Sequence, residues 1–271
     1  MEKERIDSLL VRKGFFSSRE QAKRSIMAGL VYMNNERIDK AGTRVPVDGS
    51  IKVKGQLHPY VSRGGLKLEE AIRSFGLQLE NRVVLDIGAS TGGFTDCALQ
   101  NGARLVYAVD VGYGQLAWKL RQDPRVVVME RTNFRYLNSE DLTGDTPDFA
   151  VADVSFISLR HILPNIKCLL QTDGEVVVLV KPQFEAGKEE VGKKGIVKDP
   201  KVHRQVLLKM VHLADSLGYR INGLIPSPIQ GGEGNIEFLY YLKLSPEEKQ
   251  DISQWESLIA YVVQEAHQRF Y

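Results

Sequence analysis

The chain has 271 residues, of which 43% are hydrophobic and 26% are charged, a composition typical of an ordinary globular protein. Its longest unbroken aliphatic run, residues 176–180, is far shorter than the roughly 18 residues that a membrane span requires, so we expect no transmembrane helix. The charged first residues lack the apolar segment of a signal peptide, which predicts a cytoplasmic protein. The five histidines are scattered without metal-ligand spacing, so we expect no metal site.

The net charge of +2 hides an asymmetry between two parts of the sequence. Residues 1–60 carry 12 Lys and Arg against 7 Asp and Glu, whereas the remaining residues carry 24 against 27. A compact basic segment on a nearly neutral body predicts a partner with a phosphate backbone.

Residues 4–54 show the pattern of a small α+β unit. Apolar residues at helical spacing predict a first helix that ends at Gly14, which is well placed as a C-cap. A capping-box pattern at Ser18 opens a second helix, and Gly29 ends it. The expected buried stripe of this second helix comprises Ala22, Ile26 and Met27. Short strands are expected at 31–33, 37–38 and 50–54, the first two joined by a turn at 34–36.

This unit resembles the S4 RNA-binding domain in its residues 5–10 and 18–31. The resemblance implies that six basic side chains face RNA: Arg5, Arg12, Lys13, Arg19, Lys23 and Arg24. Arg19 and Lys23 are four residues apart and therefore share a helix face; a merely solvated basic face is the alternative. We expect an S4-like domain at 1–54, a linker at 55–62 and a large domain at 63–271.

The large domain alternates between strand and helix patterns. Strands are expected at 82–87, 104–109, 125–129, 148–153 and 175–181, and later at 219–225 and 237–242. Such alternation predicts a parallel sheet that is covered by helices on both faces. Residues 182–200 are predicted to form a mobile loop over a site, and the last helix, which carries Trp255, is predicted to pack in the core.

Residues 83–95 predict a strand, a glycine-rich turn and the start of a helix. Turns of this kind lie at the carboxyl ends of strands in open α/β sheets, where ligands bind. Ser90 breaks the dinucleotide fingerprint G-x-G-x-x-G, leaving D-x-G-x-x-x-G-G from Asp86 and a second strand that ends in Asp110. This arrangement suits S-adenosylmethionine, whose ribose hydroxyls need an acceptor; a turn that binds nothing is the alternative.

The expected contacts to S-adenosylmethionine follow from these positions. The methionine part would be held by Gly88, Ser90, Gly92 and Gly93, and the ribose hydroxyls by Asp110. Asp86 would orient the loop or the amino group, and Asn133 would touch the adenine edge.

Four charged residues fall near the ends of predicted elements: Lys67, Asp153, Lys181 and Glu237. Lys67 is on the helix before the first strand, Asp153 and Lys181 close the fourth and fifth strands, and Glu237 opens the final strand. Strand ends on the carboxyl side of a parallel sheet converge on one crevice, so these side chains are candidates for one site. Surface ion pairs that lie far apart are the alternative.

This order of Lys, Asp, Lys and Glu, with the glycine loop after Asp86, resembles the FtsJ type of RNA ribose methyltransferase. Together with the S4-like segment and the motifs at 62–67, 153–158, 180–185 and 234–238, the whole chain resembles the TlyA family. The resemblance implies S-adenosylmethionine-dependent methylation of a ribose 2′-hydroxyl, at a cytidine of ribosomal RNA, with ribosomal RNA or subunits as partners. It also implies an α/β fold, a Rossmann-like methyltransferase sheet with a terminal antiparallel strand, beside the small α+β S4-like domain.

The residue chemistry fits this reaction. A ribose hydroxyl is a poor nucleophile, so its proton must be drawn off as the methyl group arrives. A lysine can be the base only when it is neutral; burial and a nearby cation lower a lysine pKa, and a carboxylate raises it. We assign Lys181 as the general base, Lys67 as its electrostatic neighbour that orients the hydroxyl, and Asp153 and Glu237 as the carboxylates that hold both lysines.

Three other functions are considered. Residues 181–184 superficially resemble the loop of base-amino methyltransferases, although a charged lysine in the first position cannot accept a hydrogen bond from an exocyclic amine. The haemolysin label of the TlyA family suggests a membrane-active toxin, which no spanning or amphipathic pore segment supports. An RNA-binding protein with an inactive methyltransferase fold is disfavoured by the four intact charged residues.

Overall fold

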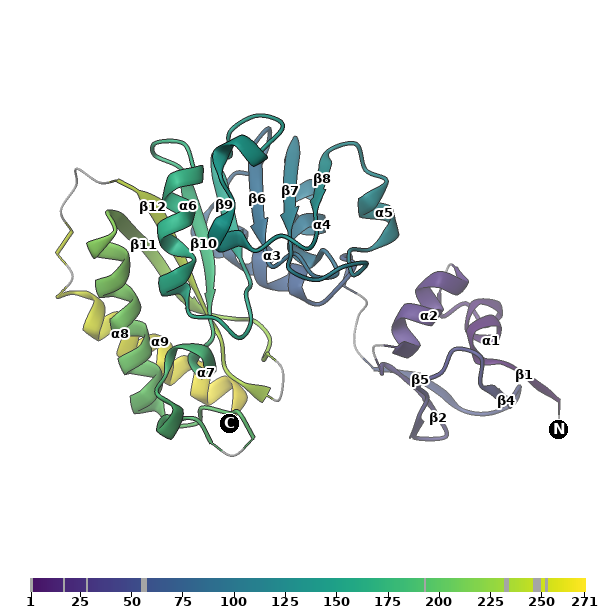
Figure 1. Cartoon of the computed structure of the whole chain (residues 1–271). Coiled ribbons are helices and arrows are strands. Elements are labelled where there is room, and N and C mark those ends of the chain that lie inside the picture. The colour runs from purple at the N-terminus through teal and green to yellow at the C-terminus, as the bar shows by residue number, and fades with distance from the viewer. Residues whose placement is uncertain are drawn as a thin grey trace. The chain divides into compact units, whose positions relative to one another are not determined.

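The computed structural model describes residues 2–16, 18–27, 29–54, 58–192, 194–231, 234–245, 250–251 and 253–271 (Figure 1). Contacts divide the chain into two compact units, Met1–Pro59 and Tyr60–Tyr271. Of the predicted linker, residues 55–57 lie outside the described residues. Val61, by contrast, donates its N–H to Asp96 Oδ2 at 2.8 Å and so belongs to the second unit.

The small unit has two helices and two small sheets. Helices α1 (Ile6–Arg12) and α2 (Arg19–Met27) accompany the pair β1 (Lys3–Arg5) with β4 (Arg44–Pro46) and the sheet β3 (Glu36–Arg37), β2 (Val31–Met33), β5 (Ile51–Val53). Asn34 and Asn35 form the predicted turn between β2 and β3 with φ of 51° and 68°. Ala22 and Ile26 are buried as predicted, but Met27 is 75% exposed. Met27 follows Ile26 directly in the helix, so its side chain points away from the stripe formed by Ala22 and Ile26.

The large unit contains a seven-stranded sheet. Its strand order is β11 (Tyr219–Pro226), β12 (Phe238–Leu244), β10 (Glu175–Val180), β9 (Phe149–Ala152), β6 (Val83–Ile87), β7 (Leu105–Val109) and β8 (Val126–Met129). The β6–β7, β7–β8, β6–β9 and β9–β10 pairs are parallel, whereas β12 runs antiparallel to both β10 and β11. The α/β prediction is therefore confirmed, with the antiparallel strand last in the sequence.

Helices cover both faces of this sheet (Figure 1). One face packs against α3 (Gly64–Phe75), α4 (Gly93–Gln100) and α5 (Trp118–Arg121); the other packs against α6 (Leu163–Leu169), α8 (Pro200–Ser216) and α9 (Trp255–Phe270). Side chains alternate along a strand, so in β6 Val84 packs on the face covered by α3, α4 and α5, whereas Val83 and Leu85 pack on the face covered by α6, α8 and α9. Short 3₁₀ turns are η1 (Phe134–Tyr136), η2 (Ser139–Asp141), η3 (Leu159–His161) and η4 (Lys188–Glu190).

The segment predicted as a loop at 182–200 contains structure of its own. It begins with α7 (Pro182–Glu185), and the Glu185 carboxylate accepts hydrogen bonds from Ser158 Oγ at 2.5 Å and Leu159 N at 2.7 Å. Farther along, the buried Val197 donates its N–H to Asn235 Oδ1 at 3.1 Å, and its carbonyl lies 3.1 Å from His203 Nε2. These long-range bonds fix a segment whose composition alone predicts irregular structure.

Candidate active site

Two cavities, each of about 360 Å³, open at the carboxyl edge of the sheet. The first, the lysine cavity, includes Lys67, Lys181, Arg63 and Gln230 in its wall. The second, the Asp110 cavity, runs along the end of β7. The two share Gly88, Ser90, Asp153 and Ser155. A ligand in one cavity would therefore lie against the same wall as a ligand in the other.

The glycine loop after β6 is shaped by close packing. Gly88 has φ of +83°, and a Cβ at this position would lie 2.6 Å from the carbonyl oxygen of Asp153. Gly92, the N-cap of α4, has φ of +96°, and a Cβ there would lie 2.2 Å from Leu120 Cδ1. Both positions therefore need glycine. The contact at Gly88 brings the glycine loop directly against the residues that follow β9.

The Asp110 cavity combines a fixed carboxylate with apolar walls. Asp110 accepts hydrogen bonds from Ser90 N at 2.8 Å and Gly112 N at 2.7 Å, and each oxygen keeps a further lone pair. Asn133 caps η1, where its Oδ1 accepts from Arg135 N at 3.2 Å, and it also lines the cavity. The apolar walls include Val109, Phe134, Ile157 and Ile162. The cavity therefore offers a hydrogen-bond acceptor for hydroxyls beside an apolar slot.

Two predicted cofactor contacts do not line either cavity. Gly92 is the buried N-cap described above, and Asp86 is fully buried behind the loop. Asp86 Oδ2 accepts from Thr95 Oγ1 at 2.6 Å, while Oδ1 has no hydrogen-bond partner among the described residues. Burial raises the pKa of Asp86 to about 7, against the hydrogen bond from Thr95. Its position favours support of the loop over direct contact with a ligand.

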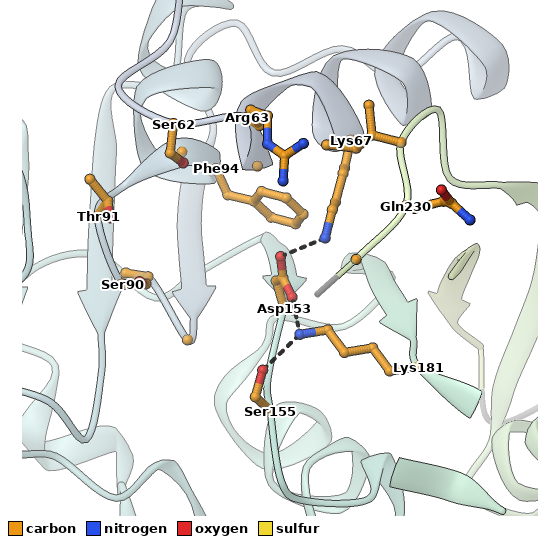
Figure 2. Close-up of a pocket in the computed structure, with 16 residues that line it drawn as sticks. Ser62, Arg63, Lys67, Ser90, Thr91, Phe94, Asp153, Ser155, Lys181 and Gln230 are labelled. Carbon is orange, nitrogen blue, oxygen red and sulfur yellow. Dashed lines mark hydrogen bonds and ion pairs between the residues drawn. The ribbon is translucent and has the colours of Figure 1, made fainter. Parts of the chain in front are cut away.

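The four predicted catalytic residues come together around one carboxylate. Asp153 Oδ1 lies 2.7 Å from Lys181 Nζ, and Asp153 Oδ2 lies 3.3 Å from Lys67 Nζ (Figure 2). On its other side Lys67 Nζ contacts Glu237 Oε2 at 2.7 Å. The exposed fractions of the four side chains are 9% for Lys67, 20% for Asp153, 10% for Lys181 and 2% for Glu237. The predicted alternative of separate surface ion pairs is therefore wrong.

The electrostatics of this cluster follow from burial and mutual attraction. Burial lowers the pKa of Lys67, but Asp153 and Glu237 outweigh it, and the pKa is raised overall. Burial likewise opposes ionisation of Asp153, but the two lysines hold its pKa below the usual range. The pKa of Glu237 is raised, because burial outweighs the attraction of Lys67. Lys67 is thus held as a cation.

The two lysines have different partners. Among the described residues, both ion-pair partners of Lys67 are carboxylates, whereas Lys181 has one carboxylate and one neutral partner, Ser155 Oγ, to which Nζ donates at 2.9 Å. Ser155 was missed as a separate site residue, although it lies within the motif at 153–158; its spacing of two residues after Asp153 is the signal that marks it.

The six predicted RNA contacts in the small unit divide into two groups. Arg5 and Arg19 both bind the buried carboxylate of Asp7, at 3.0 and 2.8 Å, and Arg12 binds Glu4 at 2.7 Å. The second group is exposed and makes no ion pair within 4.0 Å among the described residues; it comprises Lys13, Lys23 and Arg24. The guanidinium groups of the first group remain about half exposed, at 47% to 55%.

Among the residues that the structure describes, no helix combines the length and apolar character needed to cross a bilayer. Within the same residues, no group of side chains is arranged to hold a metal ion.

The sheet with its antiparallel β12, the glycine loop after β6 and the cavities on either side of that loop define a Rossmann-like methyltransferase. Residues 60–244 match the family described as FtsJ-like methyltransferase, and residues 4–51 match the S4 domain. The chain belongs to the TlyA family of FtsJ-like methyltransferases, which carry an S4 domain.

Three similar proteins illustrate this membership. A Bacillus subtilis (strain 168) protein named "Putative rRNA methyltransferase YqxC" is 57% identical over 265 residues, which cover 98% of this chain and 94% of the relative. The Mycobacterium tuberculosis "16S/23S rRNA (cytidine-2'-O)-methyltransferase TlyA" is 45% identical over 240 residues, covering 88% and 89%. A solved structure titled "Putative hemolysin from Streptococcus thermophilus" has a TM-score of 0.79 and 52% identity, covering 100% of this chain and 98% of that one.

Proposed function

We propose that this enzyme transfers a methyl group from S-adenosylmethionine to the 2′-hydroxyl of a cytidine in ribosomal RNA, with Lys181 as general base. The observation that carries the role of Lys181 is the asymmetry of the two lysines, since Lys67 lies between two carboxylates and Lys181 does not. The named activity of the Mycobacterium tuberculosis relative supports the choice of ribose and cytidine. The S4-like domain, expected at 1–54, would bind the substrate, which is ribosomal RNA or a ribosomal subunit. The reaction would take place in the cytoplasm.

The Asp110 cavity fits S-adenosylmethionine by the chemistry of its walls. The carboxylate of Asp110 would accept the ribose hydroxyls, the apolar slot would hold the adenine, and Asn133 would meet the edge of the base. Gly88, Ser90 and Gly93 would hold the methionine part, supported by Asp86 and Gly92 behind them. When bound, S-adenosylmethionine supplies a methyl carbon on a sulfonium sulfur, which keeps the bonding electron pair as a neutral thioether.

The residues of the lysine cavity would handle the proton of the ribose hydroxyl. A neutral Lys181 Nζ takes this proton while the oxygen forms its bond to the methyl carbon. Lys67, held as a cation, stabilises the negative charge that develops on the oxygen. Asp153 binds both lysines and Glu237 binds Lys67 from behind, so the two carboxylates fix the positions of the two amines.

The test is incubation of the protein with ribosomal subunits and methyl-labelled S-adenosylmethionine, followed by digestion of the RNA to nucleosides. We expect the label in 2′-O-methylcytidine. Label on a base nitrogen would contradict the proposal and favour the base-amino reaction. Label on the ribose of another nucleotide would agree with ribose methylation and contradict only the choice of cytidine.

A further inference from the structure

Ser155 occupies the position where the two cavities meet. It follows β9 by three residues and lines both the lysine cavity and the Asp110 cavity. Figure 2 shows its side chain directed toward the amine of Lys181, and Oγ accepts a hydrogen bond from Nζ at 2.9 Å. Of the four residues in the shared wall, Ser155 alone offers a neutral hydroxyl to a lysine.

The backbone around Ser155 is held by contacts on both sides. Before it, the carbonyl of Asp153 is so close to Gly88 that no side chain fits between them. After it, Phe156 adopts a left-handed conformation with φ of +63°, which is unusual for a bulky residue. The ring of Phe156 contacts that of Phe184, at 5.1 Å between centroids, and Phe184 follows Lys181 by three residues. The segments that carry the hydroxyl and the amine are thus joined at a second point.

The hydrogen bond restricts the orientation of the amine. Besides its bond to carbon, a lysine Nζ has three tetrahedral positions, each filled by a hydrogen or by the lone pair. In an unrestrained side chain, rotation about the Cε–Nζ bond moves all three freely. Here Asp153 Oδ1 takes one position, at 2.7 Å, and Ser155 Oγ takes a second, at 2.9 Å. As far as the described residues go, this leaves the third position of Nζ open, and tetrahedral geometry fixes its direction.

We propose that Ser155 is a positioning residue for the general base, which directs the third position of Lys181 Nζ at the ribose 2′-hydroxyl; this inference rests on the proposed function. The neutral amine has two N–H groups and one lone pair. The two N–H groups donate hydrogen bonds to Asp153 and Ser155, and the lone pair fills the third position. The proton then passes from the 2′-oxygen to Nζ, as the electron pair of that oxygen forms the bond to the methyl carbon. Both hydrogen bonds persist throughout, so no reorientation is needed.

The experiment compares Ser155→Ala, Ser155→Thr and a matched control, Ser216→Ala, with the full-length wild type. Ser216 is exposed, and within the described part of the chain its hydroxyl donates to Leu213 O of its own helix. Single-turnover rates of ribose methylation are measured across pH, and the affinity for S-adenosylhomocysteine is measured by calorimetry. Thr keeps the hydroxyl, so it distinguishes loss of this group from a general disturbance of the loop.

We expect Ser155→Ala to lower the single-turnover rate about 10- to 100-fold, the range for a lost hydrogen bond to a charged group. Affinity for RNA and for S-adenosylhomocysteine should change less than about twofold. A purely structural defect would lower these affinities together with the rate. Ser155→Thr should restore most of the rate, and Ser216→Ala should match the wild type.

Three results would overturn the inference. They are an undiminished rate in Ser155→Ala, a rate in Ser155→Thr as low as in Ser155→Ala, or a loss of rate matched by an equal loss of S-adenosylhomocysteine affinity. Absence of ribose product from the wild type is a separate outcome, because it would refute the proposed function itself and this inference with it.

Discussion

Each unit of the molecule contains a carboxylate that is shared by two cationic side chains; that of Asp7 is fully buried and that of Asp153 is 20% exposed. In the small unit, Asp7 binds Arg5 and Arg19 at 3.0 and 2.8 Å. In the large unit, Asp153 binds Lys67 and Lys181 at 3.3 and 2.7 Å. The charges are arranged alike, but the cations differ in chemistry and in exposure.

This difference suits the Asp7 cluster to a structural role and the Asp153 cluster to the reactive role that we propose for it. A guanidinium is not deprotonated in proteins, so the Asp7 cluster can only join the end of β1, the start of α1 and the start of α2. An amine can lose its proton when its surroundings permit, and the lysines are at most 10% exposed, whereas Arg5 and Arg19 are about half exposed. A shared carboxylate can therefore support acid–base catalysis only where one of its cationic partners is able to lose a proton and where water is excluded.

The largest effect should come from making the reactive cluster like the structural one. Lys181→Arg keeps the charge but removes the base, so we expect methylation to fall about 10²- to 10⁴-fold, as for loss of general-base catalysis. Affinity for S-adenosylhomocysteine should be retained. Methylation is measured by incorporation of labelled methyl groups, with Lys181→Ala in parallel.

Two further variants serve as controls for this experiment. Lys67→Arg preserves a permanent cation and should keep more activity than Lys181→Arg, because the role proposed for Lys67 requires only its charge. Lys209→Ala, on the exposed face of α8, should leave activity unchanged. Equal activities of Lys181→Arg and wild type would show that Lys181 is not the base.

A buried carboxylate without a cation should respond to pH in the opposite way to a paired one. Burial raises the pKa of Asp86 from 3.8 to about 7, so between these values the folded chain binds the proton more tightly than the unfolded chain. Its contribution to the free energy of unfolding should therefore fall as pH rises from about 4 to 8, by about 4 kcal/mol. Urea unfolding of wild type and Asp86→Asn at pH 5 and pH 8 measures the difference, and a difference independent of pH would contradict this account.

The Asp7 cluster should show a smaller effect with the reverse dependence on pH. The hydrogen bond from Arg5, followed by that from Arg19, holds the pKa of Asp7 well below its usual range in spite of burial. Its stabilisation should be complete above about pH 4 and should be lost as pH falls further. Asp7→Asn should destabilise α1 by about 1–3 kcal/mol at pH 7, measured by amide hydrogen exchange in the full-length protein. Exchange in α6 should be unaffected and provides the internal control.

The smallest effects should separate the free basic side chains from the paired ones. Lys13→Ala and Lys23→Ala should each weaken RNA binding a few fold and lower the slope of log affinity against log salt by about one. Arg12→Ala should have a smaller effect on that slope, because Glu4 already compensates its charge. Filter binding of ribosomal RNA fragments at several salt concentrations tests this order, and equal slopes for all three variants would reject it.

Much of the large unit could be predicted because its strands and charges follow regular rules. The strands from 82–87 to 175–181 were located by aliphatic runs between helical stretches, and the site followed from the convergence of strand ends at Asp153 and Lys181. The hydrogen bond between Ser155 and Lys181 could not be predicted, because it joins side chains 26 residues apart whose orientations the strand pattern does not set. The pairing of Arg5 with Asp7 was missed because RNA contact and internal ion pairing demand the same residue type.

Glu237 has a consequence for the folding of the last strand. Strand β12 begins Phe-Leu-Tyr-Tyr-Leu and is largely buried, so its apolar side chains do not by themselves distinguish the native alignment, Val180 with Phe238, from one slipped by two residues. Such a slip would carry Glu237 about 7 Å along the strand and leave Lys67 without its second carboxylate. The buried ion pair thus favours a single register of β12, and a slipped register would also break up the cluster to which we assign the reaction.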